Sequence, residues 1–132
     1  MKPTIPQFQN IIWDYYRQEG RALLWRKPEH THDPYKILVS EIMLQQTQVS
    51  RVNLKYPQFI KVFPNFKTLA KAPLAHVLSV WQGMGYNRRA LALQKIAIIV
   101  MKEFGGKLPK DPEILNTFPG IGPHTAGSIA AF

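Results

Sequence analysis

The sequence predicts an all-α fold, and three observations support that prediction. Apolar residues recur at helical spacing along almost the whole chain, without any sustained period-two alternation. Two Asp-Pro pairs each place a capping side chain directly before a proline at the first helical position. Two consecutive glycines follow the longest helical pattern, which they should terminate. We expect helices near residues 5–18, 34–47, 49–62, 66–71, 73–82, 88–104, 112–117 and 124–132.

Capping and helix-breaking residues justify these helices in chain order. Asp33-Pro34 opens the second helix, and Pro57 falls inside the third, which we expect it to kink or split. Pro73 opens the fifth helix, Gly105-Gly106 ends the sixth, and Asp111-Pro112 opens the seventh. The other helices are predicted from apolar periodicity. The expected product is a short-looped helical domain without repeats or an obvious linker.

The composition is that of one globular domain. At 132 residues and 45% hydrophobic content, the chain is large enough to bury a core and too apolar to be disordered. Because it contains no Cys, disulfides and cysteine metal sites are excluded. The N-terminus lacks the apolar segment of a signal peptide, and the longest apolar stretch, around 97–101, is far too short to cross a bilayer. We therefore expect a cytoplasmic protein.

The charge balance favours a polyanionic partner. The chain has 17 Lys and Arg against 8 Asp and Glu, a formal net charge of +9. Nucleic acid is the simplest partner for such an excess. A solubility bias or an anionic membrane surface is the alternative, but no amphipathic helix with a continuous basic face is evident. We expect nucleic acid and no membrane.

One carboxylate falls on an apolar helix face. Ile37 and Leu38 precede Glu41 by four and three residues, so the three side chains lie on one side of the second helix. Leu44 and Gln45 continue that side one turn later. An acid surrounded in this way loses hydration, which raises its pKa toward the range that a general acid needs. The alternative, which this spacing alone favours, is a boundary acid whose head stays in water.

Three glutamines follow Glu41 in the run SEIMLQQTQV at 40–49. An amide offers both a donor and an acceptor, so it can mimic a base edge or fill the gap that an extruded nucleotide leaves. This pattern strengthens the interpretation of Glu41 as a functional acid. Glutamine is also a good helix former, so a structural role remains open.

The segment PGIG at 119–122 reads as a phosphate-binding hairpin between two helices. Glycines let the backbone approach a phosphate, and the following helix offers unpaired N–H groups and a positive dipole end. Ile121 has the character to anchor the hairpin in the core. Such contacts give position and affinity without sequence specificity. The alternative is an ordinary glycine-rich turn. The Thr-Ala-Gly that follows the hairpin favours the phosphate-binding interpretation over that alternative.

A third motif, WQGMGYNRRA at 81–90, sets an aromatic residue on a glycine loop before two arginines. Tyr86 would push into a base stack while Arg88 or Arg89 meets phosphate. A packed loop tyrosine beside a solvated basic helix start is an equally supported alternative. We assign no metal site to the polar loop at 29–33, whose His and acidic residues lack convincing spacing, and we place His76 on a helix surface.

In this order and at these separations, the three motifs resemble those of the helix-hairpin-helix DNA glycosylases. The match is closest to the MutY-type adenine glycosylases, which remove adenine mispaired with 8-oxoguanine or guanine. It runs from about Leu24 to Phe132, and its most specific part is the segment 33–36 followed by 40–49. In endonuclease III the position of Glu41 is not a carboxylate. The archaeal-type thymine mismatch glycosylases are closer, but the Gln-Gln-Thr-Gln run favours the adenine group.

The resemblance implies a fold and a pocket. Residues 21–132 would form a six-helix barrel domain that ends in the helix-hairpin-helix, and residues 1–20 would be the N-terminal helix of a companion domain. Glu41 would protonate a ring nitrogen of adenine and make the base a better leaving group. The residues that would line the pocket for the flipped base are Trp25, Arg26, Leu44 and Gln46.

The resemblance also implies the DNA contacts. Gln45 and Tyr86 would enter the duplex around the lesion, while Gly120 and Gly122 would hold its backbone. His124 joins the substrate-binding residues, at a position where adenine enzymes usually carry Ser or Tyr and bifunctional lyases carry a Lys nucleophile. Because His forms Schiff bases poorly, strand-cleaving lyase chemistry is not expected. The partner would be double-stranded DNA with an A:8-oxoguanine or A:G mispair.

The resemblance covers only the N-terminal part of the family's fold. The family's catalytic Asp would follow the hairpin beyond Phe132, and the four cysteines of a [4Fe-4S] cluster would lie further on, so no cofactor is expected in this chain. We expect the 132-residue chain alone to be weakly active or inactive, with a second chain as one source of the missing half. A non-catalytic helix-hairpin-helix DNA-binding module is the alternative function, and a thymine mismatch glycosylase is another.

Overall fold

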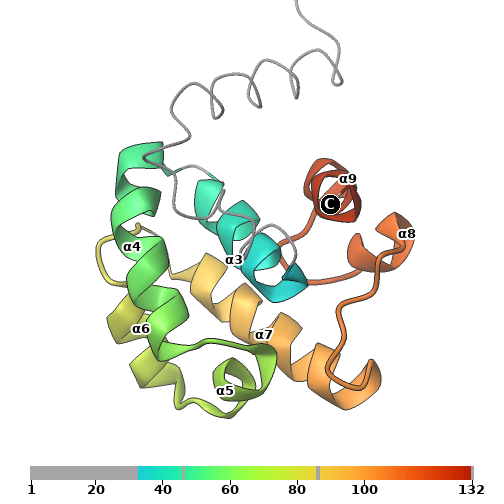
Figure 1. The fold of residues 1–132 in the computed structure, drawn as a ribbon, viewed down its shortest axis with the longest axis horizontal. Coiled ribbons are helices and arrows are strands. Elements are labelled where there is room, and N and C mark those ends of the chain that lie inside the picture. The colour runs from blue at the N-terminus through green and yellow to red at the C-terminus, as the bar shows by residue number, and fades with distance from the viewer. Residues whose placement is uncertain (1–32, 46, 86, 132) are drawn as a thin grey trace, which may run out of the picture.

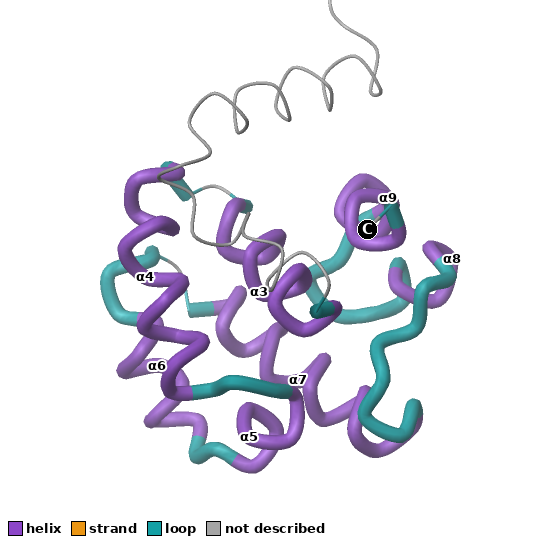
Figure 2. The backbone as a smooth tube through the Cα atoms, viewed as in Figure 1, coloured by secondary structure: helices purple, strands orange, loops and turns teal. Residues whose placement is uncertain are grey.

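The computed structural model describes residues 33–45, 47–85 and 87–131, and in these ranges all regular structure is helical (Figures 1 and 2). No strand occurs among them, so the all-α prediction is confirmed. The described helices are α3 (Pro34–Leu44), α4 (Val49–Val62), α5 (Phe66–Lys71), α6 (Leu74–Trp81), α7 (Arg88–Glu103), α8 (Pro112–Leu115) and α9 (Pro123–Ala130). The helix expected at 5–18 and the domain boundary expected near residue 20 lie outside the described residues.

The predicted helix boundaries carry the expected caps. The Asp33 carboxylate accepts hydrogen bonds from the backbone N–H groups of Tyr35 at 3.0 Å and Lys36 at 3.5 Å, at the start of α3. The Asp111 carboxylate accepts one from the N–H of Glu113 at 2.9 Å, at the start of α8. Such side-chain caps satisfy N–H groups that have no partner inside the helix. At the end of α7, Gly105 and Gly106 have φ of 62° and 84°, as a glycine terminator requires.

Some observed helices differ from the predicted ones. Helix α3 ends at Leu44 rather than near residue 47, because Gln45 has an extended ψ of 116°, and α8 ends at Leu115 rather than near residue 117. Of the predicted kink or split at Pro57, the split does not occur, because α4 continues from Val49 to Val62. Pro57 removes one backbone donor. The helix is held in register on both sides of that point by Val52, Tyr56 and Phe59, which are fully buried on one face.

The core lies around α3 and α7, which run through the middle of the fold (Figure 1). Helix α7 packs against α3, α5 and α6, while α4 packs against α3 and α6; α9 packs on α3 and α8. Large side chains from these helices are fully buried, among them Leu38, Ile42, Phe59, Trp81 and Leu93. Each contributes roughly 1.5–3 kcal/mol through its removal from water. This packing holds α3 between α4, α7 and α9.

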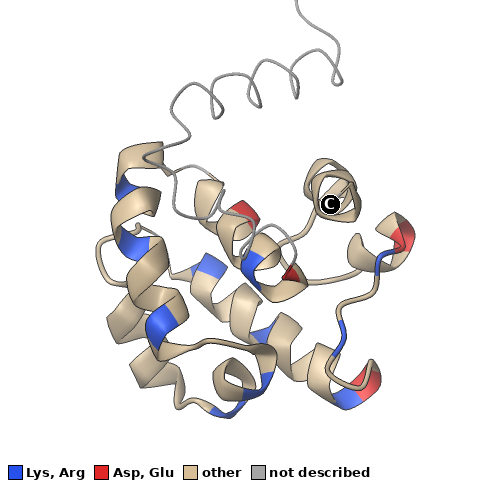
Figure 3. Cartoon of the chain, viewed as in Figure 1, with Lys and Arg blue, Asp and Glu red and all other residues tan. Residues whose placement is uncertain are grey.

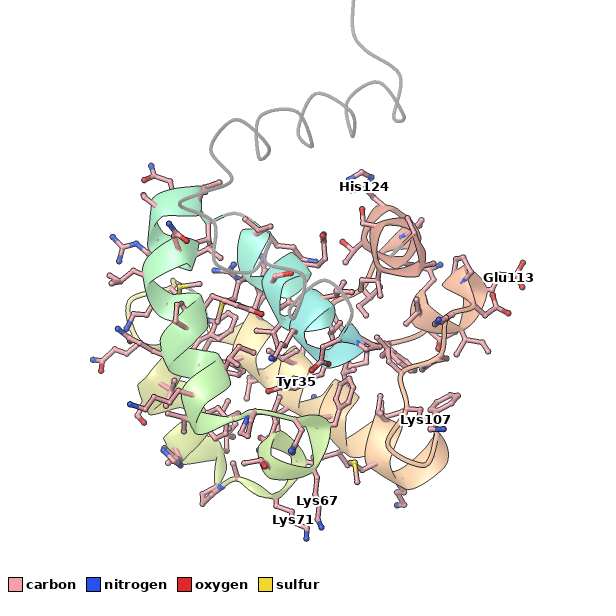
Figure 4. All side chains as sticks on the ribbon, viewed as in Figure 1. Tyr35, Lys67, Lys71, Lys107, Glu113 and His124 are labelled. Atoms are coloured by element: carbon pink, nitrogen blue, oxygen red, sulfur yellow. The ribbon has the colours of Figure 1, made fainter. Side chains whose placement is uncertain are left out.

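Buried polar groups tie the helices together. The Tyr35 hydroxyl points into the interior (Figure 4) and donates to the carbonyl oxygen of Phe63, where α4 ends. Gln94 of α7 donates from Nε2 to the carbonyl oxygen of Ala72 at 2.7 Å and to that of Leu69 at 3.2 Å. Such bonds satisfy carbonyls at helix ends that have no partner within their own helix. In the part of the chain that the structure describes, no helix is long and apolar enough to cross a membrane.

Candidate active site and nucleic-acid interface

Glu41 lies on α3, one turn before the helix ends. Its neighbours on that helix face, Ile37 and Leu38, are 7% and 0% exposed, and Leu44 is half-buried. Glu41 itself is half-buried. The carboxylate therefore stands at the border between the core and solvent, with the apolar surroundings that the sequence predicts. Partial burial of this kind is compatible with a protonated acid in a substrate pocket and with a boundary acid.

Gln45 joins the end of α3 to the hairpin. Its Nε2 donates to the carbonyl oxygen of Gly120 and to Oγ1 of Thr125, both at 3.2 Å. These contacts span 75 and 80 residues of sequence. Gln45, one helical turn after Glu41, therefore connects the end of α3 to the hairpin, although the two come from opposite ends of the described chain.

The two hairpin glycines have different surroundings. Gly120 has a φ of 76°, and a Cβ added to it would lie 2.9 Å from the Cβ of Ala92 on α7. Gly122 precedes the first residue of α9, and a Cβ there would meet nothing within 4 Å. Ile121 between them is 5% exposed, so it anchors the hairpin in the core as predicted. Of the two glycines, only Gly120 is in close contact with α7.

His124 lies in the first turn of α9 and is exposed, pointing outward from the fold (Figure 4). Its predicted role at a substrate therefore requires contact with a partner that covers this surface of α9. His76 is exposed as well, with its ring 5.2 Å from that of Phe63.

Arg89 is half-buried at the centre of the site. Its side chain crosses from α7 to the end of α3, and its guanidinium lies 5.5 Å over the Trp81 ring. Burial, and secondarily the charge of Arg88, lowers the pKa of Arg89 below its ordinary value. Arginine keeps its proton at neutral pH nonetheless. The acceptors of its hydrogen bonds are the carbonyl oxygens of Met43, Gln45 and Met84 and Oγ1 of Thr47.

A groove of about 480 Å³ runs beside the hairpin. Helix α7 forms one wall with Arg88, Ala92 and Lys95, and Pro119 and Gly120 form the other. Arg88 and Lys95 are both exposed and are seven residues apart, which is two helical turns on one face. Positive charge therefore borders the hairpin glycine on the side that solvent reaches.

Sequence reasoning missed two members of this site. Lys95 has a recognisable signal, because its seven-residue spacing from Arg88 places both on one face of α7. Thr125 has no such signal, since its contact with Gln45 bridges 80 residues. The predicted residues Trp25, Arg26, Gln46 and Tyr86 lie outside the described residues. Within the described ranges, no group of three or more His, Cys, Asp or Glu side chains is placed to hold a metal ion.

The sequence profile of the HhH-GPD superfamily of base excision DNA repair proteins matches residues 39–127, more than half of the chain. The chain belongs to this superfamily. The matched HhH-GPD segment contains α4 to α8 and most of α3 and α9, and with them Glu41 and the hairpin. The resemblance expected from the three motifs is therefore confirmed.

Curated relatives in this superfamily are named adenine DNA glycosylase. The chain is 43% identical over 126 residues to the one from Buchnera aphidicola, which covers 95% of this chain and 35% of that protein. It is 40% identical over 133 residues to the mouse one, which covers 96% of this chain and 26% of that protein. The chain thus spans about a third or less of the length of these relatives.

Solved structures support the same HhH-GPD fold. A thermostable thymine-DNA glycosylase superposes with a TM-score of 0.77 and 28% identity, over 96% of this chain and 58% of that one. A non-covalent endonuclease III–DNA complex superposes with a TM-score of 0.72 and 18% identity, over 98% of this chain and 60% of that one. The second likeness, at so low an identity, concerns the fold alone.

Proposed function

We propose that this protein is a base excision DNA glycosylase that removes adenine paired with 8-oxoguanine or guanine. The observation that carries the proposal is the junction between α3 and the hairpin. Gln45, one turn after Glu41, is hydrogen-bonded to the carbonyl oxygen of Gly120. An acid on α3 therefore lies one helical turn from the residue that contacts a hairpin suited to a DNA backbone. The relatives named adenine DNA glycosylase support the choice of base.

In the proposed reaction, the target adenine leaves the base stack, because its glycosidic bond cannot be reached inside a duplex. Glu41 donates a proton to a ring nitrogen of adenine, and the C1′–N9 bond breaks with its electron pair moving to the base. Water adds to C1′ and loses a proton, which leaves an abasic site and free adenine. General acid assistance of this kind contributes roughly 100- to 10,000-fold in rate.

The backbone contacts in this proposal come from two elements. One element is the hairpin, where the backbone around Gly120 and Gly122 and the start of α9 would contact neighbouring phosphates of one strand. The other is α7, whose Arg88 and Lys95 border the adjacent groove. His124, exposed on α9, would face the DNA from the same side as the hairpin. The pocket for the base would combine Leu44 with Trp25, Arg26 and Gln46. Tyr86 would enter the duplex, and Gln45 would do so by exchanging its bonds to Gly120 and Thr125 for contacts with DNA.

A cation that develops on the sugar needs a second negative group, as in the two-carboxylate reactions of glycosidases. Of the described acids besides Glu41, Asp33 and Asp111 cap helices, and Glu103 and Glu113 are exposed on α7 and α8. We therefore expect the stabilising carboxylate to come from outside the described residues. With no Cys in its 132 residues, this chain cannot supply the thiolates of a [4Fe-4S] cluster, and the proposed steps use none.

The test is single-turnover adenine release from an A:8-oxoguanine duplex by the complete protein that contains this chain. Glu41→Gln removes the acidic proton at constant size, so we expect the rate to fall at least about 100-fold while duplex affinity is kept. Glu103→Gln, an exposed acid on α7, serves as the matched control and should keep the wild-type rate. The 132-residue chain alone should be about 100- to 1,000-fold slower than a full-length glycosylase, because none of its described acids is assigned to stabilise the sugar cation.

Two results would contradict the proposal. A near-normal rate in Glu41→Gln would mean that Glu41 is a boundary acid. DNA binding by the complete protein without release of any base would favour a non-catalytic DNA-binding module. The third possibility is a thymine mismatch glycosylase, and a parallel assay on a G:T duplex tests it. Thymine release that exceeds adenine release would favour the activity named for the thymine-DNA glycosylase that shares the fold.

A further inference from the structure

Arg89 supplies the positive charge that α3 lacks at its own C-terminus. The last turn of α3 contains no basic residue, although the carbonyl groups at a helix end carry partial negative charge and have no partner within the helix. Nη1 of Arg89 meets this end at the carbonyl oxygen of Met43, 3.1 Å away, and at that of Gln45. Its bond to Oγ1 of Thr47, at 2.6 Å, reaches the chain just beyond. A side chain from α7 therefore caps α3 from across the fold.

The same guanidinium holds the glycine loop that follows α6. Nη2 of Arg89 donates to the carbonyl oxygen of Met84, and Nη1 of Arg51, from α4, donates to that of Gly83 at 2.7 Å. The loop backbone is thus tied on both sides. Gly83 and Gly85 have φ of 91° and 98°, backbone conformations that glycine adopts readily and that residues with a Cβ rarely adopt.

We propose that Arg89 is a positioning residue that locks the end of α3 and the 82–85 loop into one arrangement, rather than a phosphate ligand. Its fork-shaped donors are engaged by four acceptors of this chain, and its guanidinium is partly desolvated over Trp81. The end of α3, with Gln45, and the 82–85 loop would then meet DNA in a fixed relation to each other. This inference rests on the proposed function.

The decisive variant is Arg89→Lys in the complete protein, because lysine keeps the charge and loses the fork. We expect hydrogen exchange at the backbone N–H groups of Gln45 and Met84 to quicken about tenfold or more, since both report on the two ends of the lock. Single-turnover release of adenine at saturating DNA should fall about tenfold or more. The salt dependence of binding to undamaged duplex should stay at the wild-type value. Lys102→Ala, a charge lost from the exposed end of α7, should change none of these readouts.

The proposal is overturned if Arg89→Lys exchanges and reacts like the wild type. It is also overturned if Arg89→Ala lowers the logarithmic salt slope by about 0.9, the value for one lost phosphate contact in B-form DNA. Thr47→Val removes one acceptor of Arg89 and one donor to the Gln45 carbonyl oxygen, and it keeps the fold testable should both Arg89 variants unfold. It should quicken exchange at both Gln45 and Met84, and an unchanged rate at Met84, the far end of the lock, counts against the proposal. If the wild type releases no adenine while the exchange effects appear, the lock stands and the proposed function fails.

Discussion

At the scale of single residues, the two hairpin glycines show how one motif contains different requirements. Gly120 has a left-handed backbone and faces Ala92 at a distance that leaves no room for a methyl group. Gly122 has a φ of −93° and open space around it. Gly120 also offers the carbonyl oxygen that Gln45 binds. Close approach to α7, and through it the placement of Gln45, therefore depends on Gly120.

We predict that Gly120→Ala destabilises the protein by at least about 2 kcal/mol, through left-handed strain and a clash with Ala92. Gly122→Ala is the matched control, and it should stay within about 0.5 kcal/mol of the wild type. Urea unfolding followed by circular dichroism measures both. Equal effects of the two substitutions would show that the hairpin is not pressed against α7 as described.

At the scale of elements, α3 is the helix on which the candidate site depends. Asp33 caps its start, Tyr35 ties its first turn to the end of α4, and Arg89 holds its end. Most of its middle is buried against α4, α7 and α9, while Glu41 is half-buried. Because Tyr35, Arg89 and this packing all connect α3 to other helices, the orientation of Glu41 is set by the whole domain rather than by the helix alone.

We predict that Tyr35→Phe costs about 1 kcal/mol of unfolding free energy, since the carbonyl oxygen of Phe63 loses its donor. Ser79→Ala removes an exposed hydroxyl that bonds only to the His76 carbonyl within α6, and it should cost less than about 0.5 kcal/mol. Denaturant unfolding at pH 7 compares the two. An effect of Tyr35→Phe no larger than that of Ser79→Ala would rule out a stabilising role for the tie.

The two buried tyrosines also predict a dependence on alkaline pH. Burial raises the pKa of Tyr35 and of Tyr56 well above the value of about 10 in an unfolded chain. A raised folded-state pKa gives stability that is fully present below pH of about 10 and is lost as the pH rises beyond it. We expect unfolding free energy to fall above about pH 10, with phenolate absorbance at 295 nm appearing together with unfolding. Tyr35→Phe should make the loss of unfolding free energy above pH of about 10 smaller. Phenolate formation by all tyrosines while the protein stays folded would contradict this prediction.

At the scale of the whole molecule, the chain has a net charge of +9, and the Lys and Arg of its described residues lie on several helices (Figure 3). Blue stretches of ribbon occur on α4, α5 and α7, with few red ones between them (Figure 3). Such a field attracts DNA to the protein in general. The groove beside the hairpin combines charge with backbone groups suited to phosphate, so we place the contacts that orient DNA there.

We predict that duplex affinity falls steeply with salt. The double variant Arg88→Ala with Lys95→Ala should lower the slope of log affinity against log salt concentration by about 1.8, or about 0.9 for each lost phosphate contact. The control removes charge elsewhere, with Lys61→Ala and Lys102→Ala on the exposed surfaces of α4 and α7. Fluorescence anisotropy across a salt series measures the slopes. A flat response of the wild type would exclude nucleic acid, and equal slopes for the two double variants would place the phosphate contacts outside the groove.

Local chemistry in the sequence was sufficient for the helical class, for the caps at Asp33 and Asp111, and for the glycine end of α7. Each of these depends on residues within about one helical turn, where spacing and side-chain type decide the outcome. The same holds for the apolar face around Glu41 and for the burial of Ile121. The position of Pro57 shows the limit, because packing of three neighbouring side chains kept α4 continuous where local chemistry predicted a break.

Only the tertiary structure decided which partners the polar side chains of the site take. The sequence allowed Arg89 to be a phosphate ligand as readily as a structural residue, and its contacts with α3 bridge 42 to 46 residues. Gln45 meets Gly120 across 75 residues. No local pattern encodes such contacts, because they exist only after helices α3, α7 and α9 have packed together.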